Sequence, residues 1–319
     1  MTGKLLSSIG SLGAAALALA PAAAFAVMPE PGQPVDGQVG FQPAVTPIME
    51  SIQAFHDGPL LWTCIVIVLL VLALLVVVMV RFNAKSNPTP SKTTHNTLIE
   101  VIWTVVPVLV LVIIAIPSFA VLTDQLTIPD GQRKYLGSNI FSLGEVEVPA
   151  PGLTIKATGQ QWYWDYEYVD QGLTMTSTML NDEDRLATKP NEPRLLAVDY
   201  DLVVPVDTTV RLQVTADPGG VIHAFAVPSF GVKIDAVPGR LNETWFKADR
   251  EGLFYGQCSE LCGKDHAFMP IAIRIVSQET YDTWLTAAAT NLNEANKALI
   301  IASAEAPATG VVVAENNAQ

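Results

Sequence analysis

Two long apolar runs dominate the first part of the chain. Gly58–Val80 and Val101–Leu122 contain no charged residue. About 20 apolar residues are enough for a helix to cross the hydrocarbon core of a bilayer. A buried helix of a soluble protein is the alternative for each run, and it fits this length poorly. The pattern therefore predicts a transmembrane helical hairpin over residues 57–122.

The loop between the two runs is basic. Its stretch from Arg81 to Lys92 carries three basic residues, Arg81, Lys85 and Lys92, and no acidic residue. Because cytoplasmic loops are enriched in Lys and Arg, this loop is expected in the cytoplasm. Both flanking segments, including everything after Leu122, are then expected on the outer side of the membrane.

The N-terminus has the pattern of a secretory signal over residues 1–26. Lys4 precedes an apolar run around Ala14–Ala20, and Ala24–Ala26 forms a small-x-small cleavage site. A first membrane anchor is the alternative, but the run is short and Pro21 interrupts it. The hypothesis of a cleaved signal agrees with an exported domain.

Polar segments flank the predicted core regions. An exported N-terminal segment over 27–56 includes the Pro- and Gly-rich stretch Pro29–Gly40, which is expected to be extended and exposed. Near the other end, an amphipathic helix is expected after Ser277. An Ala-rich polar tail follows over 287–319, and its composition predicts a frayed or disordered end.

Between these segments, short runs rich in Val, Ile, Thr and aromatic residues recur, with Gly, Pro and Asp between them. The runs are Leu153–Ala157, Trp162–Tyr168, Arg194–Tyr200, Thr209–Thr215, Ile222–Val227, Thr244–Lys247 and Ile271–Val276. This spacing predicts an all-β sandwich or barrel, within a domain over 123–286. In the aromatic run, Trp164 and Tyr166 are expected to pack in its core or in cross-strand pairs.

Composition supports a membrane protein with an acidic exported part. The chain is 50% hydrophobic and only 15% charged, against about 25% charged in ordinary soluble domains. Its net charge of −13 argues against nucleic acid as a partner. Residues 123–276 contain 21 Asp and Glu against 13 Lys and Arg, a net charge of −8. That balance suits a basic protein partner, whose association it would accelerate.

Candidate metal ligands gather in one loop. Cys258, Cys262, His266 and Met269 lie within twelve residues, and His223 begins an earlier strand run. Thiolate and thioether sulfur combined with imidazole is the ligand set that selects copper. One copper ion needs two His, one Cys and a weak Met, whereas two thiolates on one loop can bridge a pair of copper ions.

Other interpretations of this loop explain fewer of its residues. A Cys258–Cys262 disulfide is plausible in an exported protein, but it leaves both His and the Met without a role. A structural zinc site has no use for Met269. The domain's two His and two Cys all belong to the copper hypothesis. An electron-transfer protein and a copper-binding assembly protein both remain open at this point.

Five stretches together match a known pattern: Cys258–Met269, His223–Ser229, Trp162–Tyr168, Phe41–Ala44 and Glu100–Thr104. They resemble subunit II of bacterial aa3-type haem–copper cytochrome c oxidases, over roughly residues 39–286. The resemblance implies a cupredoxin-type Greek-key barrel on a two-helix anchor. It also implies that electrons from cytochrome c pass through a binuclear CuA centre to haem in subunit I, where oxygen reduction drives proton translocation.

The resemblance assigns roles to single residues. It implies five side-chain copper ligands: His223, Cys258, Cys262, His266 and Met269. Glu260 would give copper its backbone carbonyl and would bind, through its carboxylate, a Mg²⁺ ion shared with subunit I. Trp162 would be the point at which electrons enter, and Glu100 would serve proton uptake. Glu167, Asp170 and Asp199 match positions that dock cytochrome c.

The resemblance also implies surroundings and shows two departures. Subunits I and III and membrane lipid are the expected neighbours, in the bacterial plasma membrane. Both termini and the copper domain would be periplasmic. Gln160 stands where many relatives have His, and Gly220 replaces an acidic docking residue. The cytochrome footprint is therefore expected to be shifted, with the copper ligands unaffected.

Overall fold

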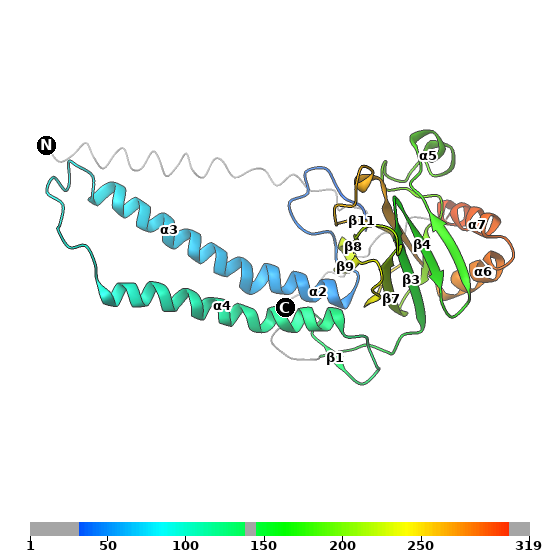
Figure 1. The fold of residues 1–319 in the computed structure, drawn as a ribbon, viewed down its shortest axis with the longest axis horizontal. Helices are drawn as coiled ribbons and strands as arrows, with labels where there is room; N and C mark the ends of the chain where they lie inside the picture. The colour runs from blue at the N-terminus through cyan, green and yellow to red at the C-terminus, as the bar shows by residue number, and fades with distance from the viewer. Residues whose placement is uncertain (1–31, 138–144, 306–319) are drawn as a thin grey trace, which may run out of the picture.

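The computed structural model describes residues 32–137 and 145–305. The predicted signal peptide and the last 14 residues of the predicted tail lie outside these ranges. The described part consists of a helical hairpin that extends from a β-rich body (Figure 1).

Two long helices form the hairpin. In the first arm, α2 (Pro47–Phe55) is joined to α3 (Leu61–Arg81) by η1 (His56–Leu60), a kinked turn in which Gly58 has non-helical backbone angles. The second arm is α4 (Thr97–Leu126). The 21 residues of α3 span about 32 Å, close to the thickness of a bilayer core. Their apolar side chains are exposed, as expected for helices that face lipid.

The C-terminal end of α4 is joined to the β-rich body by hydrogen bonds. The last four carbonyls of a helix lack intrahelical partners. Here Trp245 Nε1 donates to the carbonyl of Asp124 over 2.8 Å, and Thr244 Oγ1 donates to that of Gln125 over 2.9 Å. The buried Asp124 carboxylate also pairs with Arg133 over 2.9 Å. These contacts hold the body against the end of the anchor.

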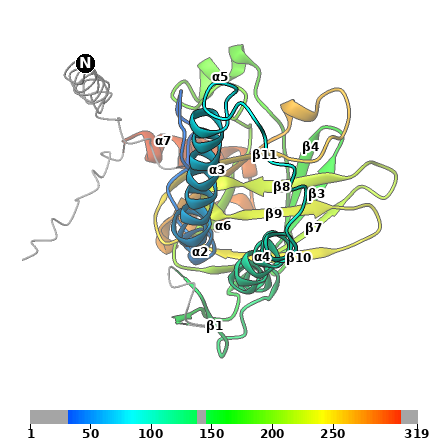
Figure 2. The same ribbon diagram turned by 90° about the vertical axis from the view of Figure 1, so that its left-hand side faces the viewer.

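Two five-stranded sheets face each other in the body (Figure 2). The first, in spatial order, is β10 (Asn242–Lys247), β7 (Thr209–Ala216), β3 (Leu153–Gln160), β4 (Tyr163–Tyr168) and β5 (Leu173–Ser177). The second is β6 (Leu202–Pro205), β12 (Pro270–Val276), β11 (Gly252–Cys258), β8 (His223–Val227) and β9 (Val232–Ala236). β1 (Lys134–Tyr135) and β2 (Val146–Glu147) pair separately. All pairs are antiparallel except β3–β7 and β6–β12.

The core lies between the two sheets. Along β3, buried and half-buried residues alternate, which places Ile155 inward. Trp164 and Tyr166 on β4 are also buried there, as predicted, and Phe225 on β8 meets them from the other sheet. Each such large side chain contributes roughly 1.5–3 kcal/mol by leaving water. The prediction of a two-helix hairpin with an all-β barrel of cupredoxin type is confirmed.

The prediction of one strand was wrong. Arg194–Tyr200 forms turns, with a single bridge between Val198 and Met179. Its apolar residues Leu196 and Val198 are buried against Tyr255, on the outer side of the second sheet. The run is apolar because it covers this sheet, although it does not pair as a strand. A short helix, α5 (Asp182–Thr188), precedes it.

Both polar flanking segments are more ordered than predicted. α6 (Gln278–Ala288) is the expected helix, but α7 (Leu292–Glu305) occupies part of the predicted disordered tail. Ala295 and Leu299 of α7 are buried, and Trp284 Nε1 donates to Asn296 Oδ1 over 2.8 Å. These contacts stabilise a helix that composition alone does not predict.

The N-terminal linker matches its prediction only in part. Its residues 34–40 are exposed, but Gly32 is buried and its carbonyl accepts the N–H of Tyr255 over 3.0 Å. At Gly32 the linker is therefore part of the β-rich body.

Candidate metal centre

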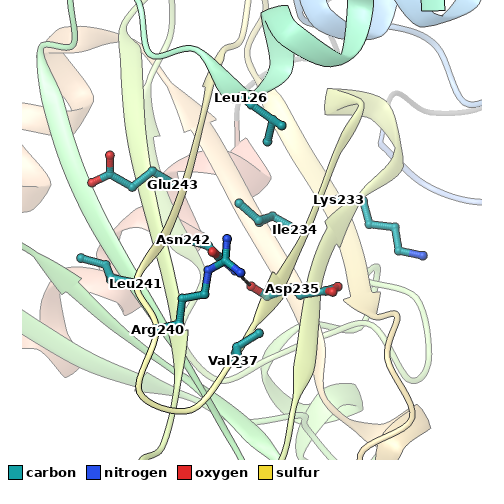
Figure 3. Close-up of a pocket in the computed structure, with 9 residues that line it drawn as sticks. All are labelled: Leu126, Lys233, Ile234, Asp235, Val237, Arg240, Leu241, Asn242 and Glu243. Carbon is teal, nitrogen blue, oxygen red and sulfur yellow. Dashed lines mark hydrogen bonds between the residues drawn. The ribbon is translucent and has the colours of Figure 1, made fainter. Parts of the chain in front are cut away.

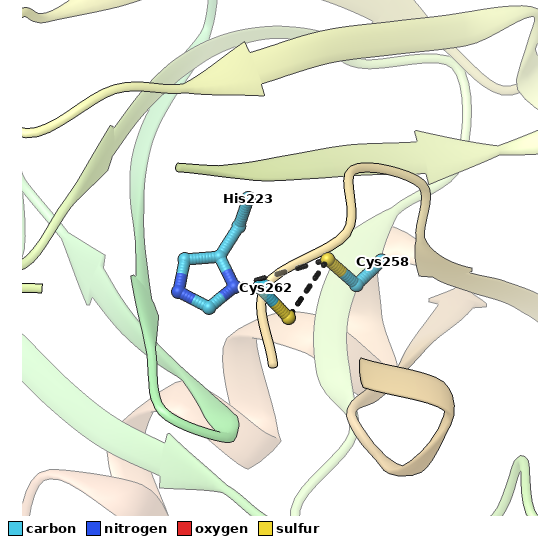
Figure 4. A group of neighbouring side chains, drawn as sticks. All are labelled: His223, Cys258 and Cys262. Atoms are coloured by element: carbon cyan, nitrogen blue, oxygen red, sulfur yellow. Dashed lines mark hydrogen bonds between the residues drawn. The ribbon is translucent and has the colours of Figure 1, made fainter. Parts of the chain in front are cut away.

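The sulfur and imidazole side chains lie on strands β8 and β11 of the second sheet and in the loop between β11 and β12. His223 is the first residue of β8 and is fully buried. Cys258 ends β11, where it pairs with Phe225 of β8. Cys262 lies in the loop after β11, and Met269 directly precedes β12. Pairing of β8 with β11 thus brings His223 beside the two cysteines (Figure 4).

The predicted donor atoms form a continuous cluster in which neighbours lie 3.3 to 3.8 Å apart. The contacts are Cys258 Sγ to Cys262 Sγ (3.8 Å), His223 Nδ1 (3.8 Å) and the Glu260 carbonyl (3.3 Å), and Cys262 Sγ to His266 Nδ1 (3.5 Å) and Met269 Sδ (3.6 Å). The two cysteines are free, since a disulfide requires about 2.05 Å between its sulfur atoms. The fold therefore brings all six predicted metal-site residues together.

Burial favours the neutral forms of Cys262 and His223 in this cluster. Burial, with the neighbouring Cys258, raises the pKa of the Cys262 thiol to about 12. Burial, with nearby His266, lowers the pKa of His223, so its imidazole stays neutral and keeps a lone pair for a metal. Two thiols, two imidazoles and a thioether match the soft ligands of copper better than those of zinc.

Trp162 contacts the loop of the cluster directly. Its indole Nε1 donates to the backbone carbonyl of Cys262 over 3.0 Å. Gly263 has φ of +123° and leaves no room for a side chain, because a Cβ there would lie 2.8 Å from the Trp162 ring. The ammonium of Lys264 lies 5.3 Å from the centre of that ring, within range of a cation–π interaction. Trp162 is thus a half-buried aromatic ring beside the cluster.

Two of the three predicted docking acids, Glu167 and Asp170, lie apart from Trp162. That residue precedes β4, whereas Glu167 lies near the far end, about 17 Å along the strand. Glu167 faces Lys156 at 3.5 Å, and the Asp170 carboxylate accepts the N–H of Thr154 over 3.0 Å. They occupy the end of the β3–β4 pair that is remote from the cluster.

Asp199 has local hydrogen-bond partners. Its carboxylate accepts the backbone N–H of Thr178 over 2.7 Å and that of Tyr200 over 2.8 Å. Burial raises its pKa. This carboxylate therefore stabilises the turn region that covers the second sheet.

The remaining predicted residues are exposed or distant. The Glu260 side chain is exposed beside the cluster. Glu100 lies in the first turn of α4, at the end remote from the body, and the length of α4 separates it from the cluster (Figure 1). Its Oε1 accepts the N–H of Asn96 over 3.2 Å, and the Asn96 side chain accepts from Leu98 and Ile99 in return. Glu100 thus helps to begin the helix.

A separate open pocket of 720 Å³ lies between the edge strands β9 and β10 (Figure 3). Its lining residues are Leu126, Lys233, Ile234, Asp235, Val237, Arg240, Leu241, Asn242 and Glu243. None of them was predicted as a site residue, and none belongs to the sulfur–imidazole cluster.

Two family models match the chain. The model described as "Cytochrome C oxidase subunit II, periplasmic domain" matches residues 153–276, and that described as the transmembrane domain of the same subunit matches residues 34–121. A probable cytochrome c oxidase subunit 2 of Rickettsia conorii is 48% identical over 254 residues, which cover 79% of this chain and 72% of the relative. The cytochrome c oxidase subunit 2 of Cereibacter sphaeroides is 39% identical over 269 residues, covering 80% and 81%.

A solved structure is similar to part of the chain. The periplasmic domain of subunit II of cytochrome oxidase of Bradyrhizobium japonicum is 56% identical, with a TM-score of 0.41. The match covers 46% of this chain and 99% of that domain.

Proposed function

The chain belongs to the family of cytochrome c oxidase subunit II and is an oxidase subunit, and on that premise we propose that it carries a binuclear CuA centre that accepts electrons from cytochrome c and passes them to haem in subunit I. One observation carries this proposal: two free thiols, two imidazoles and a thioether lie in contact, all of them buried except the half-buried His266. Oxygen reduction and proton translocation would follow in the partner subunit.

In this proposal five side chains hold copper: His223, Cys258, Cys262, His266 and Met269. Copper held by these residues would supply a one-electron redox centre. The protein contributes neutral imidazoles, thiols that must lose their protons on binding, and a weak thioether ligand. Burial of Cys258, Cys262 and Met269 would keep water away from a metal bound there.

Electrons would enter at Trp162. Its hydrogen bond to Cys262 supports this role, because it connects a half-exposed ring to the backbone of a proposed ligand. Glu167, Asp170 and Asp199 would contribute negative charge that attracts a basic cytochrome c. The net charge of −8 over residues 123–276 supports the same direction of attraction.

The remaining assignments concern subunits I and III and the membrane. The exposed carboxylate of Glu260 is available to a Mg²⁺ ion shared with subunit I. Glu100, on the opposite side of the membrane, would take up protons. The basic loop from Arg81 to Lys92 would be cytoplasmic. The copper domain and both termini would then lie in the periplasm of a bacterium, anchored in its plasma membrane.

Spectroscopy of the full chain, purified in detergent and loaded with copper, tests the proposal. We expect two copper ions per chain, a near-infrared absorption band and the EPR signal of a mixed-valence pair. A single-copper or EPR-silent site would contradict a CuA centre and favour a copper-binding assembly protein. Co-purification of subunits I and III from membranes would test the assignment of partners.

A further inference from the structure

His223 is packed against two residues of the facing sheet. Gly159 on β3 and Trp164 on β4 are direct cross-strand partners. The space beside Gly159 is filled by the imidazole: a Cβ at Gly159 would lie 2.9 Å from Cδ2 and 3.0 Å from Cγ of His223. The rings of Trp164 and His223 lie 6.1 Å apart at an interplanar angle of 62°. Both residues of this cross-strand pair therefore contact the imidazole of His223.

Trp164 also contacts a second part of the cluster. Its indole Nε1 donates to the backbone carbonyl of Met269 over 3.3 Å. The ring is fully buried and also packs edge-on against Phe225, with centroids 5.2 Å apart. A single rigid side chain thus contacts His223 on β8 and the residue that precedes β12.

Packing takes the place of a hydrogen bond at His223. Histidine ligands usually donate their second ring nitrogen to a carboxylate or carbonyl, which sets the orientation of the ring. Here Nε2 of His223 is buried and has no hydrogen-bond partner among residues 32–137 and 145–305. The walls around the ring, Gly159 and Trp164, are then what restrains its rotation.

We propose that the Gly159–Trp164 pair is a positioning element that orients the His223 imidazole and the Met269 backbone at the copper site. This inference rests on the proposed CuA function. Position 159 must be glycine in this proposal, because a methyl group there would lie 2.9 to 3.1 Å from His223 and displace its ring. On its other side, Nδ1 of His223 faces Cys258 Sγ at 3.8 Å, so a displaced ring changes the donor geometry.

Two substitutions test the pair, each with a matched control. Gly159→Ala adds one methyl group against the ring, and Trp164→Phe removes the indole N–H while retaining an aromatic ring. Gly152→Ala is the control for the first, since its Cβ meets only the Thr208 methyl at an ordinary 3.4 Å. Tyr166→Phe is the control for the second, because Tyr166 is buried on the same strand and its hydroxyl has no partner among the residues described.

The measurements use the full chain in detergent: copper affinity by competition with a chelator, the EPR hyperfine pattern after loading, and unfolding of the copper-free protein. Loss of supporting contacts around a metal ligand typically weakens metal binding about 10- to 100-fold. We expect a loss in this range and an altered hyperfine pattern for Gly159→Ala and Trp164→Phe, with wild-type behaviour in both controls.

The outcomes separate this inference from the proposed function. If wild-type protein shows no two-copper signal, the CuA proposal fails. If it shows one, and both test variants retain its copper affinity and hyperfine pattern, the positioning role is overturned. Lower stability of the copper-free variants with unchanged spectra overturns it equally, because the pair would then only support folding. Should Trp164→Phe fail to fold, Gly159→Ala decides the question by the same measurements.

Discussion

Trp162 Nε1 donates a hydrogen bond to the backbone carbonyl of Cys262 over 3.0 Å, although 100 residues separate the two in sequence. The bond joins the turn between β3 and β4 to the loop of the metal cluster. It gives the half-exposed indole a direct connection to a proposed copper ligand.

Trp162→Ala is expected to slow electron transfer from cytochrome c severely, because it removes both the ring and the hydrogen bond. Affinity for cytochrome c should change little, since docking is assigned to carboxylates. Stopped-flow reduction of the copper centre, compared with equilibrium binding, measures the two effects separately. Loss of affinity with normal electron transfer in the bound complex would reverse these roles.

Cys258→Ser is expected to abolish the two-copper spectrum, because a bridging thiolate is lost, and Cys262→Ser should do the same. Met269→Leu should be milder. A weak axial ligand mainly tunes the reduction potential, and a Met-to-Leu change in a core usually costs less than about 1.5 kcal/mol. EPR and redox titration measure these effects. Two bound coppers and full electron transfer in either Ser variant would refute the ligand assignment.

Glu167→Gln is expected to weaken association with cytochrome c at low ionic strength and to have little effect at high salt, where surface charges are screened. The side chain is 42% exposed, so a change of about 1 kcal/mol or less is expected. Asp199→Asn should also weaken association while its amide oxygen still accepts the two backbone hydrogen bonds. Binding measured across a salt series tests both. Equal losses at all salt concentrations would point to structural damage instead.

Glu100→Gln is expected to lower steady-state oxygen consumption by the assembled oxidase, while reduction of the copper centre by cytochrome c stays intact. The substitution is well matched, because the Gln side-chain oxygen can still accept the N–H of Asn96 that begins α4. Oxygen-electrode turnover and copper-reduction kinetics over a pH series measure the two steps. Wild-type turnover throughout that series would leave Glu100 with only its role in the helix.

A buried ionic cluster is expected to make stability depend on pH. Arg274 contacts Glu192 at 3.0 Å and Asp201 at 2.6 Å. Burial, and next the charge of Asp201, raise the pKa of Glu192 from 4.5 to about 7. The Glu192 carboxyl group therefore binds its proton more tightly in the folded chain than in the unfolded chain. The contribution of Glu192 to the free energy of unfolding is largest below about pH 4.5. It falls by about 3 kcal/mol at most as the pH rises towards 7, and then stays constant.

Glu192→Gln should flatten that slope, since no proton is exchanged at this position. Urea unfolding of the detergent-purified chain, followed by Trp fluorescence at several pH values, provides the comparison. Identical slopes in variant and wild type would assign the pH dependence to other groups.

The sequence alone determined the parts of this protein that rest on local patterns. Uncharged runs such as Gly58–Val80 identify helices long enough for a bilayer, because hydrocarbon excludes charge whatever the rest of the fold does. The spacing of Cys258, Cys262, His266 and Met269 within one loop identifies a soft metal site, because ligand chemistry depends on residue type and short reach. His223 was predicted as a further copper ligand from its residue type and from the family resemblance.

Tertiary structure decided everything that depends on long-range pairing. The pairing of β8 with β11 places His223 beside Cys258 across 35 residues of sequence. The register of β3 with β4 places Gly159 next to Trp164. An apolar run records that it is buried, but not whether it pairs as a strand or covers a sheet, so Arg194–Tyr200 was wrongly predicted. Strand partners and register are set by the whole core, and no local stretch of sequence contains that information.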